Sequence, residues 1–265
     1  MPNPIIPSSF FINYLIKVES TNQLAILEAN QGKPSGTVIV ANAQSSGRGR
    51  LGRQWLSPPG NLYTSIIIRP NCPPMIAAQI SLVTSVAIWE TVSYLLPANK
   101  KILCKWPNDI LINYKKVSGI LLESQTAIDS KNNPIVEWII VGVGINISSY
   151  PKLKENYQAT SISEECKIQI SKDQVLNLFL SNLKTMLSLW TEQGFNKIIN
   201  LWLNKTFPLG HSISVQSPKG MICGKFNGLT PQGELKIHTR AHGEKIIAAG
   251  DTYYPDTGEV NASCN

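Results

Sequence analysis

The chain has 265 residues, of which 43% are hydrophobic and 15% are charged, and its net charge is +7. These values predict a soluble globular protein with one large and one small domain, and the basic balance suits an anionic partner. No apolar run reaches membrane-spanning length and the first residues lack a signal-peptide pattern, so we expect a cytoplasmic protein without a membrane partner. The five cysteines show no Cys-x-x-Cys spacing, which predicts unpaired thiols and no zinc site.

The first part of the chain reads as strands and helices in mixed order. Ser20 or Thr21 can cap a helix after the first strand, and Pro74 opens a helix of about six turns that ends at Leu96. The polar link Asn113–Lys116 predicts a hairpin. The strands are predicted from β-branched and apolar runs at Phe10–Val18, Thr37–Ala43, Leu62–Ile68, Ile102–Lys105, Ile110–Ile112, Val117–Leu122 and Val136–Ile147.

Two further helices, Asp173–Trp190 and Phe195–Leu203, precede a change of character after Phe207. Regular short strands with Gly- and Pro-containing turns then predict a small barrel. Its predicted strands are His211–Val215, Met221–Asn227, Glu234–His238 and Lys245–Ala248. We therefore expect a main domain over residues 1–205, a barrel over 206–256 and a frayed tail over 257–265.

The most informative stretch is the loop Gln44–Trp55, in which three glycines alternate with Arg48, Arg50 and Arg53. Glycine lets a backbone approach a ligand closely, and guanidinium groups grip carboxylates and phosphates in a bidentate way. No Asp or Glu occurs between residues 29 and 89, so we interpret the arginines as lacking local partners and reserved for an incoming anion. A flexible linker with solvated charges is the alternative, but the strands on both sides favour a ligand-binding loop.

Five blocks match one family in order and spacing, and the chain thereby resembles biotin protein ligases over its whole length. The blocks are Ser20–Asn22, Gln44–Trp55, Lys105–Asp109, Lys116–Glu123 and Gly142–Asn146. The resemblance implies an α+β fold, with a mixed sheet and helices like those of class II aminoacyl-tRNA synthetases, followed by an SH3-like small β-barrel. It also implies two reactions: biotin and ATP form biotinyl-5′-AMP, and a lysine of a biotin carboxyl carrier protein, such as the acetyl-CoA carboxylase subunit, then takes the biotin.

The resemblance assigns catalytic roles to Arg48, Arg50 and Lys116, which would offset the charge of the biotin carboxylate and the α-phosphate. Asp109 is a candidate base and a candidate ligand for Mg²⁺, the implied cofactor. The residues implied to surround biotin are Ser20, Thr21, Asn22, Gln44, Gly47, Arg48, Gly49, Arg50, Lys116 and Gly119. Those implied to surround ATP or the adenylate are Arg48, Arg50, Arg53, Trp55, Asn108, Lys116 and Asn146. Trp106, Pro107 and Glu123 are interpreted as structural supports.

Simpler readings exist for several of these residues. Ser20–Asn22 can serve only as a helix cap, Asn108 and Asp109 only as a tight turn, and Lys116 only as a surface lysine of a hairpin. The chain also departs from the family in having Leu51 where a third arginine is common. Its first strand begins by Phe10, so we expect a monofunctional ligase without the DNA-binding domain of bifunctional members. A homodimer, common in the family, is a further expectation.

Two rival functions come from other groups of proteins. Lipoate or octanoate ligases and transferases share the catalytic fold, but those families lack this Gly-Arg-Gly-Arg loop and its tryptophan. A nucleic-acid-binding module would place basic and aromatic residues together on the barrel strands. The segment 211–248 holds several lysines but only Phe226 as an aromatic residue, so we expect no nucleic-acid partner.

Overall fold

The computed structural model describes residues 4–151, 158–217 and 220–257. Its centre is a seven-stranded mixed sheet with the order β1-β2-β3-β7-β6-β5-β4, in which β1 and β2 run parallel and the other neighbours antiparallel. The strands are β1 (Phe11–Val18), β2 (Thr37–Gln44), β3 (Leu62–Ile68), β4 (Ile102–Lys105), β5 (Asp109–Ile112), β6 (Lys115–Ile128) and β7 (Pro134–Ile145). The sheet confirms the expected mixed α+β class.

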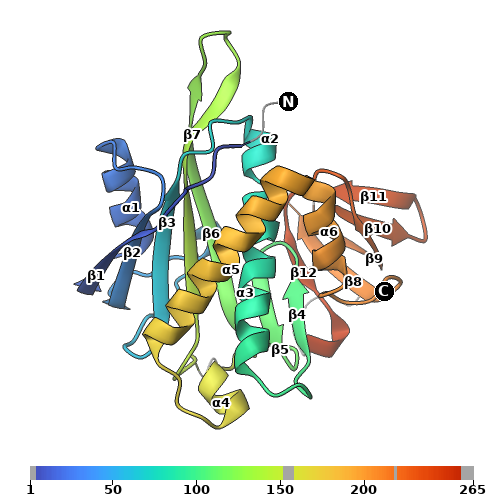
Figure 1. Ribbon diagram of the computed structural model, residues 1–265. Helices are drawn as coiled ribbons and strands as arrows, with labels where there is room; N and C mark the ends of the chain where they lie inside the picture. The colour runs from blue at the N-terminus through green and yellow to red at the C-terminus, as the bar shows by residue number, and fades with distance from the viewer. Residues whose placement is uncertain (1–3, 152–157, 218–219, 258–265) are drawn as a thin grey trace.

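Helices cover both faces of this sheet (Figure 1). On one face, α1 (Thr21–Asn30) packs Ala25 and Ala29 against Ile39 and Ile67. The other face carries α3 (Ile80–Leu95), α5 (Lys172–Gln193) and α6 (Phe195–Leu203), with short helices α2 (Pro74–Ala77) and α4 (Ile162–Cys166) at the edges of that layer. Because β3 is covered from both sides, all of its residues are buried, which explains why the strand shows no alternation of apolar and charged residues.

The long helix expected from Pro74 to Leu96 is two helices, because Ala78 and Gln79 lie between α2 and α3. Gln79 is buried there, and its side-chain carbonyl accepts a hydrogen bond of 2.8 Å from Trp190 Nε1 on α5. The stretch from Pro74 to Leu95 is long and apolar enough to cross a membrane by length and composition. Most of it is nevertheless buried inside the fold, as in the core helix of a soluble protein.

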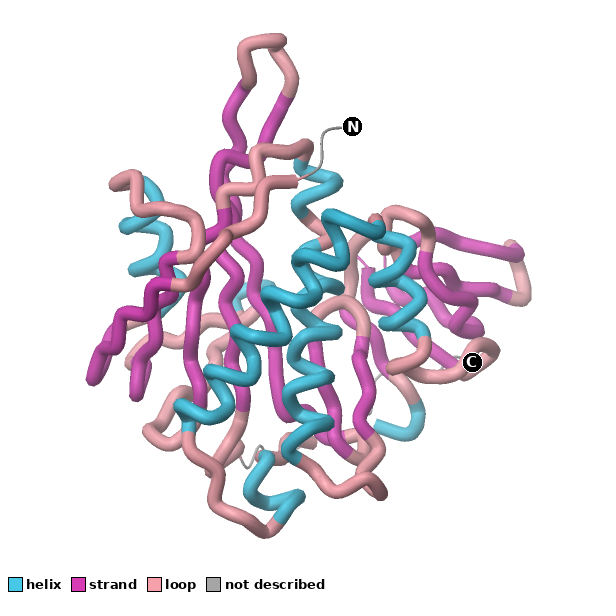
Figure 2. Tube along the Cα trace, in the orientation of Figure 1, coloured by secondary structure: helices cyan, strands magenta, loops and turns pink. Residues whose placement is uncertain are grey.

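A second sheet follows the main one and has the antiparallel order β11-β10-β9-β8-β12. Its strands are β8 (Ser212–Ser217), β9 (Gly220–Leu229), β10 (Leu235–Thr239), β11 (Gly243–Ile247) and β12 (Asp251–Tyr253). We name it the C-terminal sheet, because within the described residues its edge strands β11 and β12 do not pair with each other. It lies beside β4 and β5, as the tube in Figure 2 also shows. Of the expected tail, Thr257 is buried, and residues 258–265 lie outside the described part.

Among the cysteines that the structure describes, one differs from expectation, and Cys264 lies outside the described residues. Cys72 and Cys104 are buried free thiols, and burial raises the pKa of Cys72 to about 11. Cys166 is also free. Cys223 on β9 is disulfide-bonded, so the expectation that all thiols are unpaired is wrong there. Spacing along the chain could not reveal this bond, because pairing depends on which residues the fold brings close together.

Candidate active site

A cavity of about 420 Å³ opens on the face of the main sheet that carries α1, a size typical of small-molecule sites. Every residue that the sequence singled out as a site residue lines this cavity, except Gly47. Side chains from five separate segments of the chain therefore meet in one place. The cavity residues are Ser20, Thr21, Asn22, Gln44, Arg48, Gly49, Arg50, Arg53, Trp55, Asn108, Asp109, Lys116, Gly119 and Asn146, joined by Tyr63, Gly142, Gly144 and Asp251 among others.

Glycines form the floor of the cavity. Gly119 on β6 and Gly144 on β7 are direct cross-strand partners, and Gly142 faces Leu121 in the same ladder. The half-buried indole of Trp55 lies on this floor, so close that a Cβ atom at Gly144 would come within 2.5 Å of the ring. Side chains at these positions would fill the cavity, and the glycines keep the surface of the sheet open.

Gly47, the predicted site residue outside the cavity, lies at the base of the arginine loop, residues 44–55. Its carbonyl accepts a hydrogen bond from the amide of Trp55, and a Cβ atom there would lie 2.3 Å from the Trp55 carbonyl oxygen. Gly47 therefore lets the loop fold back so that Trp55 reaches the floor. The loop tip is exposed: Leu51 adopts a positive φ of 56°, and the residue is 77% exposed.

A buried polar network closes one end of the cavity. Ser20 caps α1 by accepting from the amide of Gln23, so the capping interpretation is confirmed for this residue. Thr21 donates from both its amide and its hydroxyl to Gln44 Oε1, at 2.8 and 3.1 Å. Ser65 on β3 donates to Asn22 Oδ1 at 2.6 Å. Sequence reasoning missed Ser65, because an isolated serine inside an apolar strand carries no recognisable motif.

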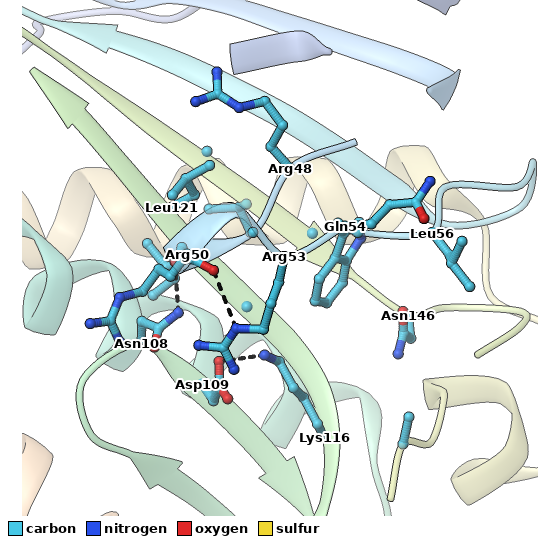
Figure 3. A pocket seen from close by; sticks show the side chains of 18 of the residues that line it. Arg48, Arg50, Arg53, Gln54, Leu56, Asn108, Asp109, Lys116, Leu121 and Asn146 are labelled. Carbon is cyan, nitrogen blue, oxygen red and sulfur yellow. Dashed lines mark hydrogen bonds and ion pairs between the residues drawn. The ribbon is translucent and has the colours of Figure 1, made fainter. Parts of the chain in front are cut away.

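Glu123 on β6 is more than a structural support, because it connects this network to the arginine loop. Its carboxylate accepts from Asn22 Nδ2 at 2.9 Å and from Arg48 Nη2 at 2.7 Å. The Arg48 side chain is 43% exposed and lies apart from Arg50 and Arg53 (Figure 3). The two arginines expected to act as a pair, Arg48 and Arg50, therefore lie on different sides of the cavity.

Lys116 and Asp109 form an ion pair of 2.6 Å over the same floor, with side chains only 15% and 10% exposed. A β-bulge explains their position: Asp109 pairs with Gly119, but Leu111 pairs with Lys116, so β6 has one extra residue. The bulge turns Lys116 to the face that carries Gly119. The Lys116 ammonium lies 5.4 Å from the centre of the Trp55 ring. The motif Lys-x-x-Gly thus encodes a lysine aimed into the cavity, and the surface-lysine alternative is wrong.

Arg50 and Arg53 have carboxylate partners from the far end of the chain. Arg50 Nη1 lies 3.1 Å from Asn108 Oδ1 and 3.3 Å from Asp251 Oδ1, and Arg53 Nη2 lies 2.5 Å from Asp251 Oδ2. The prediction that the loop arginines lack partners holds only for neighbours in sequence. In the fold, Glu123 and Asp251 neutralise them, which local sequence could not reveal.

Asn108 and Asn146 hold the rim of the cavity. Asn108 Nδ2 donates to the Ile120 carbonyl at 2.8 Å, which leaves its oxygen for Arg50. Asn146 is buried and donates to the Thr160 carbonyl at 3.0 Å. Burial raises the pKa of Tyr63, another residue of the cavity wall, to about 12, so its hydroxyl stays neutral and donates to the Pro58 carbonyl.

Within residues 4–151, 158–217 and 220–257, no three His, Cys, Asp or Glu side chains cluster as a metal site would require. Asp109 contributes a single carboxylate to the cavity beside Lys116. This arrangement fits Mg²⁺, which keeps several waters and is bound by one or two carboxylates together with substrate phosphates. The metal role of Asp109 stays a prediction.

A cavity with a glycine floor, a buried polar end and several cationic side chains in its wall is suited to a small ligand with an apolar body and negative charge. The model of the biotin/lipoate A/B protein ligase family matches residues 14–146. The chain belongs to this family.

Relatives with assigned names agree with this membership. The bifunctional ligase/repressor BirA of Bacillus subtilis is 33% identical over 238 residues, which cover 88% of this chain and 70% of the relative. The biotin–[acetyl-CoA-carboxylase] ligase of Paracoccus denitrificans is 30% identical and covers 91% of this chain and 99% of the relative. The biotin protein ligase of Aquifex aeolicus in complex with biotin and ATP matches with a TM-score of 0.74 and 29% identity, over 91% and 97% of the two chains.

Proposed function

We propose that the protein is a biotin protein ligase, which activates biotin with ATP and transfers it to a lysine of a biotin carboxyl carrier protein. The observation that carries the proposal is the arginine loop folded over the Gly119–Gly144 floor, with the Lys116–Asp109 pair at its edge. The names of the relatives and the ligands of the similar structures support it. The buried polar end and the cations divide the cavity into regions suited to a ureido ring and to anions.

Biotin is assigned to the floor and the polar end. A buried urea needs donors and acceptors in fixed positions, since unpaired polar groups cost about 1–3 kcal/mol each when they leave water. Thr21, Asn22 and Gln44 lie in the buried network and supply such groups. The apolar thiophane ring and valeryl chain would lie against Gly119 and Gly144, where Trp55 lies in this structure. Trp55 would then move away from the floor and cover the ligand.

The first reaction joins two anions, so its main requirement is fixed positive charge. A carboxylate oxygen of biotin attacks the α-phosphorus of ATP, the bond from that phosphorus to the bridging oxygen breaks, and pyrophosphate leaves. Lys116 and Arg50 are assigned to the charge that develops at the α-phosphate. In the second reaction the lysine amine attacks the acyl carbon of biotinyl-5′-AMP, loses its proton, and AMP leaves. Asp109 is the candidate acceptor of that proton.

Mg²⁺ would be carried on the phosphates of ATP with Asp109 as its protein carboxylate, and it would supply charge neutralisation there. We also expect a homodimer and a cytoplasmic location. The buried position of the apolar stretch Pro74–Leu95 supports a protein that works outside membranes. The oligomeric state can be measured by light scattering on the purified protein, with and without biotin and ATP.

Labelling of a purified carrier domain, followed by mass spectrometry, tests the proposed function. With biotin, ATP and Mg²⁺ the domain should gain the mass of one biotinyl group on its acceptor lysine. A carrier that gains lipoate or octanoate instead would move the protein to the other branch of its family. No mass gain with any of the three acids would contradict ligase activity.

Replacing Arg50 by glycine should reduce labelling and let the intermediate escape. The side chain contacts Asn108 and Asp251 at the cavity mouth, so its loss opens the loop and removes one cation. We expect biotinyl-5′-AMP to appear free in solution and unselected surface lysines to become labelled. Chromatographic measurement of free adenylate checks this, with Arg69→Gly as a matched control, because Arg69 binds backbone carbonyls away from the cavity.

A further inference from the structure

Asp251, the first residue of β12, belongs to the C-terminal sheet and yet reaches the active site. Its two carboxylate oxygens contact different arginines of the loop, Arg50 at 3.3 Å and Arg53 at 2.5 Å. The carbonyl of Gly250 accepts two further hydrogen bonds from Arg50, each of 3.3 Å. Two adjacent residues of the C-terminal sheet thus hold both guanidinium groups.

The anchor for these contacts is firmly fixed. Asp251 pairs with Gln216 on β8, and the next residue, Thr252, is buried and donates its hydroxyl to the Trp106 carbonyl of the main domain. A Cβ atom at Gly250 would lie 2.7 Å from the Gln216 carbonyl oxygen, so the backbone at this point is closely packed. The loop tip opposite is exposed at Leu51. The carboxylate is therefore the fixed partner, and the loop is the part that can move.

The charges at the site explain what the contact does. Five cationic side chains line the cavity, whereas its lining carboxylates are only Asp109 and Asp251; the cations are Arg48, Arg50, Arg53, Lys105 and Lys116. Without Asp251, two guanidinium groups would face each other at the mouth with no counter-charge, and their repulsion would open the loop. A phosphate group carries the same kind of oxygen acceptors as a carboxylate and binds guanidinium in the same way.

We propose that Asp251 is a positioning residue: it holds Arg50 and Arg53 over the cavity before ATP binds and releases them to the phosphates of ATP. The inference rests on the proposed function for the identity of the ligand, but not for the contact itself. It gives the C-terminal sheet a definite part in the site. That sheet supplies the counter-charge that keeps the arginine loop near its binding position before the ligand arrives.

Limited proteolysis of the ligand-free protein tests the contact directly. Trypsin can cut after Arg50, and cleavage of a segment that opens and closes rapidly follows the population of its open form. The variant Asp251→Asn should be cut at Arg50–Leu51 roughly tenfold faster than wild type, the factor that about 1.4 kcal/mol of lost contact produces. Asp251→Glu should restore protection. Glu244→Gln is the matched control, since it removes the ion pair between Glu244 and Lys236, which lies away from the loop.

Steady-state kinetics of adenylate formation separates positioning from a general loss of structure. Once ATP holds the arginines, Asp251 is no longer needed, so Asp251→Asn should raise the KM for ATP about tenfold and leave kcat within about twofold. A lower kcat with an unchanged KM, or unchanged tryptic cleavage, would overturn the inference. If trypsin cuts Asp251→Asn faster but biotin and ATP fail to protect the wild-type loop, the role of Asp251 in holding the loop is supported and the proposed function is contradicted. If the ligands protect wild type but the variant is cut at the wild-type rate, the proposed function stands and the inference fails.

Discussion

Replacing Lys116 by alanine should lower kcat for adenylate formation by roughly 10²–10³, the usual cost of removing one fixed donor from a charge-stabilising site. The ammonium group is largely shielded from water, held by Asp109 at 2.6 Å, and aimed into the cavity by the bulge in β6. A charge in such a position needs little rearrangement when negative charge develops nearby. Rapid-quench measurement of biotinyl-5′-AMP in a single turnover isolates this step.

Lys115 provides the control for this prediction, because it is the neighbouring residue and is exposed. Lys115→Ala removes the same charge from the chain without touching the cavity, so its single-turnover rate should stay within about twofold of wild type, as for most surface substitutions. Equal losses in both variants would indicate that net charge matters and that the position of Lys116 does not. A rate for Lys116→Ala near that of wild type would remove this residue from the proposed chemistry.

The substitution Gly142→Ala should destabilise the protein by about 3 kcal/mol and abolish biotin binding, because the added methyl group has no space. Its Cβ atom would lie 2.0 Å from Oδ1 of Asn22, which is buried beside Ser65. Asn22 would have to move, and its hydrogen bonds with Ser65 and Glu123 would break. For a chain of this size the melting temperature should fall by about 6–12 °C. Calorimetric melting and equilibrium dialysis with labelled biotin measure the two effects.

Two further variants make this prediction specific. Gly49→Ala adds the same methyl group where the nearest atom is 3.4 Å away, so its melting temperature should stay within about 2 °C of wild type. The double variant Asn22→Ala, Gly142→Ala regains the space and should recover part of the stability, although not the binding of biotin. If Gly142→Ala melts like wild type and still binds biotin, the close contact is not a constraint on the site.

Much of the main sheet was predictable because its strands are apolar and β-branched. Leu62–Ile68 has the predicted bounds, and the strands on both sides of the arginine loop lie within a residue or two of those expected. The C-terminal strand β12 was missed, since three residues of Asp-Thr-Tyr show no alternation to read. The break between α2 and α3 was also missed, because no glycine or proline marks it and a contact from Trp190 accompanies it.

The cavity residues were predictable because they occur in short motifs, whereas their partners were not. Glu123 lies 75 residues from Arg48, and Asp251 lies 201 residues from Arg50. Which carboxylates neutralise the arginines depends on the fold. The absence of Asp and Glu near the arginine loop in sequence therefore wrongly predicted arginines without partners. Gly142 belongs to one of the matched blocks, but the sequence does not show that its need for a small side chain arises from Asn22, which approaches from another element.

The central claim is that this cavity joins biotin to ATP, and exchange of labelled pyrophosphate into ATP measures that reaction without any carrier protein. The proposed function predicts exchange that depends on biotin and Mg²⁺ and that falls by roughly 10²–10³ in Lys116→Ala. Lipoate and octanoate should support no exchange above background. Exchange with either of those acids in place of biotin, or biotin-dependent exchange that is unchanged in Lys116→Ala, would contradict the account given for this site.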